Sequence, residues 1–297
     1  MNRDAPPADR APVAEAPDWG VSRRDAWILQ QQARYALSRV LPALASAGIE
    51  AVAVKGIVLA GELYAGMEER PISDVDLRII PADLRGAERV ARREGWPTWR
   101  NSNQLGSRAM VVEGTLVELE TSIGPPGLCA MTVGELIARS RKTTGKMGFE
   151  HREPELHDHV LVLCVNCFKD KLVDTTPWAI EDLLRVVALP GFDPDILWAR
   201  ASHARLSMMT WIVADWLATA HGSESWREVR DRIRGRRAGR GPYARLFRAL
   251  VARNPWSFPL ALLTRAGSDD PFLCCKALAA GGLGTAIHWA SRASAGR

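Results

Sequence analysis

The chain has 297 residues, of which 47% are hydrophobic and 25% charged, and its formal net charge is +5. These proportions are typical of a soluble globular protein and exclude a disordered chain, a collagen-like chain and a disulfide-stapled miniprotein. The 5 cysteines are irregularly spaced, which favours a reducing compartment. We find no signal-peptide pattern and no apolar run of membrane-spanning length, so we expect a cytoplasmic protein.

The first third of the chain alternates helical and strand patterns. Residues 1–22 are rich in alanine, proline and charge, and they predict a flexible tail. Apolar residues at three-and-four spacing predict a helix over 25–47, ended by Gly48. The apolar run AVAV at 51–54 predicts a buried strand, which leads directly into a helix over 56–65.

Two further strand regions follow. Alternating polar and apolar residues over 74–79 predict a strand with one polar face, and Pro81 begins a helix that runs to Arg93. Residues 108–121 predict a β-hairpin whose turn is Glu113 and Gly114.

The second half of the chain is predicted to be helical. Strand patterns end near Gly124, and the polar, basic segment 139–153 is interpreted as a linker with a domain boundary near Gly145. We therefore expect an α/β (α+β) domain over 23–145 and an all-α domain over 146–297. The expected helices are 156–173, 178–188, 194–204, 207–220, 224–234, 242–253 and 271 to the end.

Acidic residues on two predicted strands suggest a metal site. Asp74 and Asp76 are two positions apart, so on a strand they face the same side, roughly 6–7 Å from each other. Glu118 and Glu120 share a face of the hairpin in the same way. Oxygen ligands of this kind suit Mg²⁺ or Mn²⁺, and three carboxylates on adjacent strands fit two-metal phosphoryl transfer.

Basic and small residues near these acids suggest phosphate binding. Lys55 and Gly56 lie where a strand ends and a helix begins, and a helix N-terminus offers free N–H groups to an anion. Glycine allows a phosphate to approach the backbone closely. Arg70 and Ser73, just before the aspartates, could also contact phosphate oxygens.

The order strand, Lys-Gly, helix, RPISDVD and a later hairpin acid resembles the DNA polymerase β-like nucleotidyltransferases. It is most similar to the bacterial branch of uncharacterised nucleotidyltransferases, in which Lys-Gly replaces the Gly-Ser of better-known members. ASAGIE at 45–50, LVELE at 116–120, LVLCVNCFKDKL and WAIEDLLRVV extend the resemblance over about residues 25–220. The ordered set of motifs is more specific than D-x-D alone.

The resemblance implies a role for several residues. Asp74 and Asp76 would bind the metal, Glu118 would be the third carboxylate, and Lys55 and Gly56 would contact phosphate. Glu118 stands where the branch often has aspartate and Glu120 where it often has histidine, so either acid could serve. Lys169, with Lys171 as second choice, would be the basic residue that the helical half lends to the nucleotide. Asp182 matches an Asp-Leu pair of the family, without an assigned role.

The implied reaction transfers a nucleoside monophosphate from a nucleoside triphosphate, with ATP as one donor, to a hydroxyl group of a small-molecule or peptide acceptor. Pyrophosphate would leave. Relatives in this branch often accompany peptide natural-product pathways, which suggests peptide modification. Two alternatives stay open: the same pocket could use a nucleotide-sugar donor, or, because Glu118 and Glu120 depart from the family pattern, the protein could be an inactive nucleotide-binding or regulatory protein.

Two other features have a structural and a functional interpretation. Cys164 and Cys167, preceded by His157 and His159, could bind zinc, but their spacing fits a helix core better. The segment 227–253 holds ten arginines and two acids. A solvated helix pair is favoured there over nucleic-acid binding, and an RNA-directed transferase is the alternative, with Arg236, Arg237 and Arg240 as the contacts.

Overall fold

A computed structural model describes residues 20–100, 106–173, 175–234 and 240–282. Its first half is built on a five-stranded mixed sheet with the order β1-β2-β5-β4-β3. β2 and β5 are parallel, and the other neighbouring strands are antiparallel. The strands are β1 (Ala51–Val54), β2 (Asp74–Ile79), β3 (Thr98–Arg100), β4 (Ser107–Val112) and β5 (Thr115–Glu120).

The predicted hairpin is present as β4 and β5. Its turn residues, Glu113 and Gly114, have φ angles of 51° and 80°, and two successive positive φ angles match the twist of a tight hairpin. The edge strand β3 was not predicted, because three residues are too few to show an alternating pattern.

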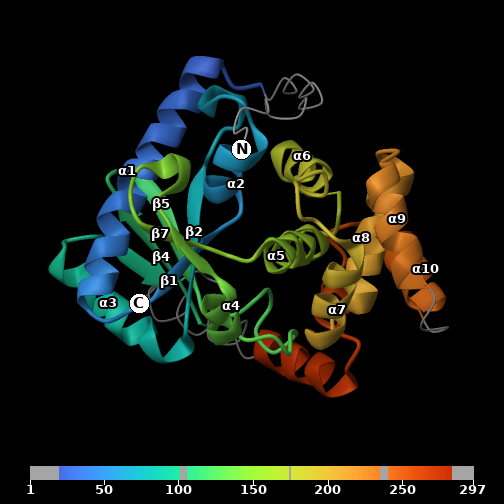
Figure 1. The fold of residues 1–297 in the computed structure, drawn as a ribbon. Helices are drawn as coiled ribbons and strands as arrows, with labels where there is room; N and C mark the ends of the chain where they lie inside the picture. The colour runs from blue at the N-terminus through green and yellow to red at the C-terminus, as the bar shows by residue number, and fades with distance from the viewer. Residues whose placement is uncertain (1–19, 101–105, 174, 235–239, 283–297) are drawn as a thin grey trace, which may run out of the picture.

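The two faces of the sheet differ in chemistry. Apolar side chains such as Val75 and Leu77 pack with α1 (Arg23–Ser46) and α3 (Leu84–Arg93) in one core. Because side chains alternate along a strand, Asp74, Asp76 and Arg78 point to the opposite face. That face is turned toward α2 (Gly56–Leu63) and the helical half of the molecule (Figure 1). The polar side chains of β2 therefore lie between the sheet and the helices.

A short hairpin follows the sheet. β6 (Arg141–Thr143) and β7 (His151–Glu153) pair antiparallel, and β7 packs beside β1. The interpretation of 139–153 as a linker is therefore wrong for these residues. The pattern is hard to recognise because the hairpin is held by polar side chains: the Glu153 carboxylate accepts hydrogen bonds from Arg141 and lies 3.0 Å from His151. The predicted boundary near Gly145 lies in the loop of this hairpin.

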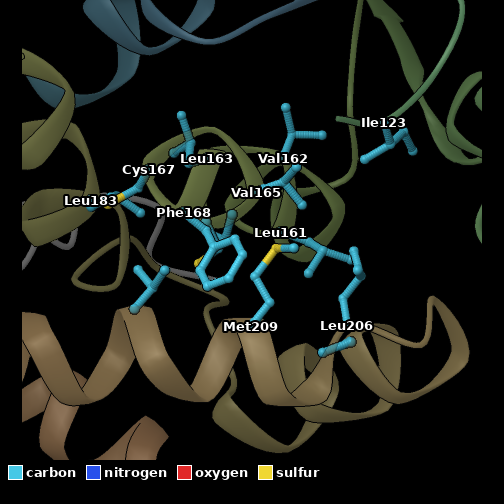
Figure 2. Close-up of a cluster of buried hydrophobic side chains, with 14 of the residues drawn as sticks. Ile123, Leu161, Val162, Leu163, Val165, Cys167, Phe168, Leu183, Leu206 and Met209 are labelled. Atoms are coloured by element: carbon cyan, nitrogen blue, oxygen red, sulfur yellow. The ribbon is translucent and has the colours of Figure 1, made fainter. Parts of the chain in front are cut away.

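The remainder of the described chain is helical. The apolar helix α5 is buried along most of its length and packs against α6, α7 and α8. Figure 2 shows Leu161 and Phe168 of α5 directed toward Met209 of α8. Residues 271–282 are also helical. The helices are α4 (Val133–Arg139), α5 (Leu156–Lys169), α6 (Pro177–Val186), α7 (Pro194–His203), α8 (Ser207–Ala220), α9 (Glu224–Arg234), α10 (Arg240–Arg253) and α11 (Phe258–Arg265).

Cys164 and Cys167 belong to this apolar core, as the structural interpretation predicts. Both side chains are buried, and burial raises the pKa of the Cys167 thiol to about 12. The nearby histidines use their Nε2 atoms for other contacts: His157 accepts the N–H of Asp193, and His159 accepts the N–H of Lys55. These four side chains therefore pack and hydrogen-bond separately instead of converging.

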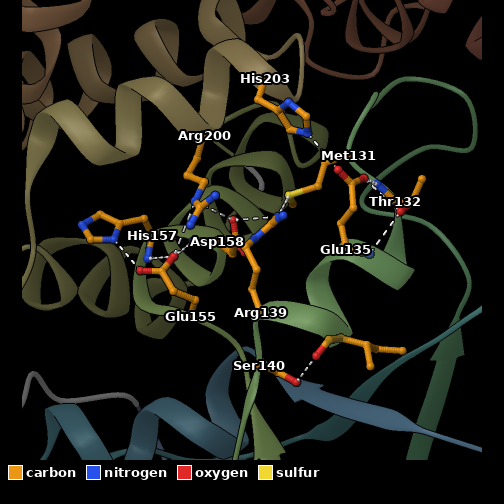
Figure 3. Close-up of polar contacts among 11 residues, drawn as sticks. Met131, Thr132, Glu135, Arg139, Ser140, Glu155, His157, Asp158, Arg200 and His203 are labelled. Atoms are coloured by element: carbon orange, nitrogen blue, oxygen red, sulfur yellow. Dashed lines mark hydrogen bonds and ion pairs between the residues drawn. The ribbon is translucent and has the colours of Figure 1, made fainter.

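A polar network joins α4, α5 and α7 (Figure 3). Asp158 is fully buried at the start of α5, and its carboxylate accepts hydrogen bonds from Arg139 of α4 at 2.6 and 3.2 Å. Arg200 of α7 lies 3.5 Å from the same carboxylate. A buried carboxylate held by two guanidinium groups fixes these helices relative to each other, because losing either partner leaves an uncompensated charge.

Arginines of the segment 227–253 that the structure describes are largely paired. Arg230 lies 3.4 Å from Asp215, and Arg232 lies 2.9 Å from Asp195. The second pair is exposed, as expected for solvated helices, whereas the first is largely buried against α8. Arg236 and Arg237 lie outside the described residues, as does the side chain of Arg240, so the RNA-binding interpretation stays a prediction. Within the described part of the chain, no helix has the length and apolarity needed to cross a membrane.

Candidate active site

The predicted acidic residues meet where β2 and β5 run side by side. In the parallel register Asp76 lies directly opposite Glu118, and Arg78 lies opposite Glu120. One carboxylate oxygen from each of Asp76, Glu118 and Glu120 lies within 4.8 Å of the others. Asp74 is outside this closest group, and its Oδ1 accepts a hydrogen bond from Ser73 Oγ at 2.8 Å.

Glu118 and Glu120 differ in their surroundings. Glu118 is half-buried and lines a cavity of about 250 Å³ together with Asp74 and Asp76. Glu120 is 5% exposed, lies deeper, and forms an ion pair with Arg78. The structure therefore places Glu118 toward the cavity and Glu120 behind it, a distinction that the shared strand face could not reveal.

The carboxylates repel one another. Burial and the charge of Asp76 raise the pKa of Asp74, and burial together with Asp76 and Glu120 raises the pKa of Glu118. Burial acts on the pKa of Asp76 in the same direction, but Lys55 and Arg78 outweigh it and hold that pKa below its ordinary value. Clustered carboxylates with raised pKa values bind a cation favourably, and an all-oxygen donor set suits Mg²⁺ or Mn²⁺.

Lys55 forms the turn between β1 and α2. Its ammonium group lies 2.7 Å from Asp76 Oδ1. Burial disfavours this charge, but the carboxylates of Asp76 and Glu120 outweigh burial and raise the pKa of Lys55. The backbone of Lys55 has φ 62° and ψ −143°, a region that costs a non-glycine residue on the order of 1–3 kcal/mol and is concentrated at functional sites.

Arg70 covers the residue that follows this turn. A Cβ atom on Gly56 would lie 2.5 Å from the Arg70 guanidinium, so a side chain at this position would have to displace that group. This is a different reason from the close phosphate approach that the sequence suggested. Arg70 is itself fixed, because its Nη2 lies 2.7 Å from Asp182 Oδ2 and the Tyr64 hydroxyl donates to Asp182 Oδ1 at 2.9 Å. Asp182 thus acquires a role as the buried anchor of Arg70.

The cavity lies between the two halves of the molecule. Lys55, Gly56, Arg70 and Ser73 line it from the sheet side, and α5 and α6 supply the opposite wall. Lys169, the first choice for a basic residue from the helical half, is part of this wall. Lys171, the second choice, instead lies 4.2 Å from the centre of the Trp256 ring. Other lining residues of the helical wall are Asn166, Asp170, Thr175, Thr176 and Trp178.

Comparison with known proteins agrees with these motifs. A family model described as uncharacterised nucleotidyltransferase matches residues 4–219, well over half of the chain. The chain belongs to this family. No curated protein matches the chain. Among solved structures, it is similar to the solution structure of the antibiotic-resistance factor ANT(2'')-Ia, at 15% identity and a TM-score of 0.41, covering 74% of this chain and 97% of that chain.

Membership of this nucleotidyltransferase family confirms the resemblance seen in the sequence and makes the protein an enzyme of nucleoside monophosphate transfer. The predicted fold class is confirmed as well, since a mixed sheet is followed by a helical region.

Several residues at or beside the site were not predicted from the sequence, or only in part. Tyr64, Arg78 and His159 were not assigned to it, and Asp182 had no role. His159 is 3% exposed and its Nε2 accepts the Lys55 N–H at 2.8 Å. The sequence suggested His159 only as an alternative zinc ligand, because its actual partner is a backbone group 104 residues away.

Stability is expected to fall on mild acidification because of His159. Burial lowers the pKa of His159 to about 4 in the folded protein, below the unfolded value of about 6.5. The unfolded chain therefore binds the proton more tightly, and the contribution of His159 to stability is present above pH 6.5 and lost as pH falls toward 4. We expect the free energy of unfolding to drop by about 2 kcal/mol between pH 7 and pH 5.

Urea unfolding at both pH values measures this effect, with His159→Gln as the control. The glutamine variant does not titrate in this range, so the difference between the two proteins isolates the histidine from the carboxylates. An equal pH dependence in both proteins would contradict the prediction.

Proposed function

We propose that the protein binds a nucleoside triphosphate with Mg²⁺ or Mn²⁺ and transfers the nucleoside monophosphate to a hydroxyl group of a small-molecule acceptor. The observation that carries this proposal is the meeting of Asp74, Asp76 and Glu118 with Lys55 and Arg70 in one cavity. The carboxylates can bind a hard cation, and the basic side chains can bind phosphate groups. Together they match the charges of a metal–triphosphate complex.

The proposed metal ligands are Asp76 and Glu118, with Asp74 completing the set and Glu120 behind them. Bound Mg²⁺ would supply Lewis-acid stabilisation of the charge on the phosphate oxygens. Lys55 and Arg70 neutralise the triphosphate from the sheet side, with Ser73 as a hydrogen-bonding partner. Lys169 approaches from the opposite wall, so the phosphates would be enclosed between the two halves.

The reaction forms one bond and breaks one. The acceptor hydroxyl oxygen attacks the α-phosphorus, and the bond from that phosphorus to the oxygen of the leaving pyrophosphate breaks. Glu118 takes the proton of the hydroxyl. Glu118 is placed for this role because it lines the cavity beside Asp74 and Asp76.

Binding of ATP, GTP, CTP and UTP, with and without Mg²⁺, tests the proposal by calorimetry. We expect metal-dependent binding of at least one nucleotide, and at least tenfold weaker binding by the variant Asp74→Asn/Asp76→Asn. The matched control Glu94→Gln/Glu150→Gln removes two exposed carboxylates outside the cavity and should bind as the native protein does.

The outcomes separate the alternatives. Binding without Mg²⁺, or equal binding by both double variants, would overturn the metal-dependent site. If a nucleotide binds, the mass of the product identifies the transferred group, because a nucleotide and a hexose add different masses. Incubation with a peptide acceptor and with a small polyol acceptor distinguishes the two acceptor classes by the same measurement.

A further inference from the structure

Two buried histidines of α5 each accept a backbone N–H group from another part of the chain. His157 Nε2 lies 2.9 Å from the N–H donor of Asp193, at the start of α7. His159 Nε2 lies 2.8 Å from the N–H donor of Lys55. Both side chains are 3% exposed. The two contacts have the same chemistry, but only the partner of His159, Lys55, lines the cavity.

The contact of His159 is made to Lys55, a residue of the site with an unusual backbone conformation. Lys55 holds a positive φ of 62° although it is not glycine, so its backbone conformation must be imposed by its surroundings. Its N–H points back to α5, and its ammonium group points forward to Asp76, 2.7 Å away. Its carbonyl accepts the N–H groups of Val58 and Leu59 and begins α2. Each polar group of the residue is thus fixed in a different direction.

We propose that His159 is a positioning residue for nucleotide binding, which holds the Lys55 backbone in its strained turn and so aims the ammonium group into the cavity. This inference rests on the proposed function. It makes the helical half a part of the phosphate site, because the turn on the sheet side is held by a side chain of α5.

The chemistry of the imidazole suits this task. A hydrogen-bond acceptor at Nε2 requires the neutral ring with its proton on Nδ1. Burial lowers the pKa of His159 to about 4, so the ring is neutral at physiological pH. The helix that carries it is anchored in the main apolar core and supplies Lys169 to the same cavity. A rigid helix is the better support for a precise contact.

The test compares His159→Phe with His157→Phe. Each variant removes one buried acceptor of a backbone N–H from the same helix and keeps an aromatic ring. The probe is Mg²⁺-tripolyphosphate, which tests phosphate binding without a choice of base, and binding is followed by calorimetry. We expect His159→Phe to weaken binding about tenfold, the loss of one well-aimed charged contact. His157→Phe should leave binding within about twofold, although it lowers stability similarly.

A double-mutant cycle separates positioning from a general structural role. In a Lys55→Gly background the ammonium group is gone and glycine tolerates the positive φ. His159→Phe should then weaken binding no further. If it weakens binding by the same factor in both backgrounds, His159 does not act through Lys55 and the inference is overturned. His159→Gln, whose amide oxygen can accept the Lys55 N–H, should recover part of the affinity.

Two further outcomes keep the test decisive. If His159→Phe fails to fold, ¹⁵N NMR of the native protein tests the same hydrogen bond. We expect the Nε2 atom of His159 to be unprotonated. A protonated Nε2 would overturn the inference. If the native protein binds neither Mg²⁺-tripolyphosphate nor any nucleoside triphosphate, the proposed function fails. If the native protein binds the probe and the two histidine variants bind it equally well, the positioning role of His159 is overturned and the proposed function is not.

Discussion

Replacing Asp76 with asparagine is expected to lower the turnover of nucleotidyl transfer by roughly 10²–10³-fold, the cost of removing one group that stabilises developing charge in an active site. Asp76 has the central position among the acids: it lies opposite Glu118 on the neighbouring strand, and its Oδ1 is 2.7 Å from the Lys55 ammonium. Asparagine keeps the volume but removes the charge that pairs with Lys55 and that we propose binds the cation.

The fold should still form after this change, with some loss of stability because Lys55 loses its charged partner. The sheet around Asp76 is held by backbone pairing and by the apolar face behind it, which the substitution does not touch. Turnover is measured at saturating Mg²⁺ and nucleotide, and the midpoint of urea unfolding is measured in parallel. Glu94→Gln, at an exposed acid, is the control for loss of one negative charge. An Asp76→Asn protein with native turnover would contradict the assignment, whereas lost turnover with lost structure would show a structural role.

The sequence predicted the acidic strand well because its signal is local. Asp74, Asp76 and Arg78 alternate with apolar residues, and a period of two is visible without any partner. The alignment of β2 with β5 depends on a connection that contains α3, β3 and β4, and no local pattern measures it. The choice between Glu118 and Glu120 was therefore open, and Arg78, the partner that separates them, is known only from the fold.

The residues that hold the Lys55 turn, which we propose binds phosphate, were missed for the same physical reason. Lys55 and His159 are 104 residues apart, and Arg70 and Asp182 are 112 residues apart. Each contact is made by tertiary packing, so the residues show neither periodicity nor spacing. For Gly56 the sequence suggested room for a phosphate, whereas the group next to it in the structure is the Arg70 guanidinium.

The hairpin of β6 and β7 was missed for a different reason, although its two strands are close together in the sequence. A polar, basic segment resembles a linker because most strands are recognised by apolar residues. Here the pairing is supported by charged side chains, with Arg141 and His151 on Glu153. A short strand on the edge of a domain buries little apolar surface, so its pattern is governed by those contacts.

Replacing Asp182 with alanine is expected to lower the free energy of unfolding by about 3–5 kcal/mol, the cost of breaking one side of a buried ion pair. The side chains of Arg70 and Asp182 are 6% and 1% exposed, so the guanidinium would remain buried without its counter-ion. The Tyr64 hydroxyl would lose its acceptor in the same step. Urea unfolding measures the change, and Asp195→Ala, in an exposed pair with Arg232, should cost less than about 1 kcal/mol.

The double variant Arg70→Met/Asp182→Leu separates stability from function. It removes both charges and fills the space with apolar groups, so it should recover most of the stability that Asp182→Ala loses, because a buried pair is often replaceable by packed apolar residues. Nucleotide binding should not recover, since the guanidinium that covers Gly56 and faces the cavity is gone. A stable double variant that binds nucleotide as the native protein does would show that Arg70 and Asp182 hold the fold together without taking part in phosphate recognition.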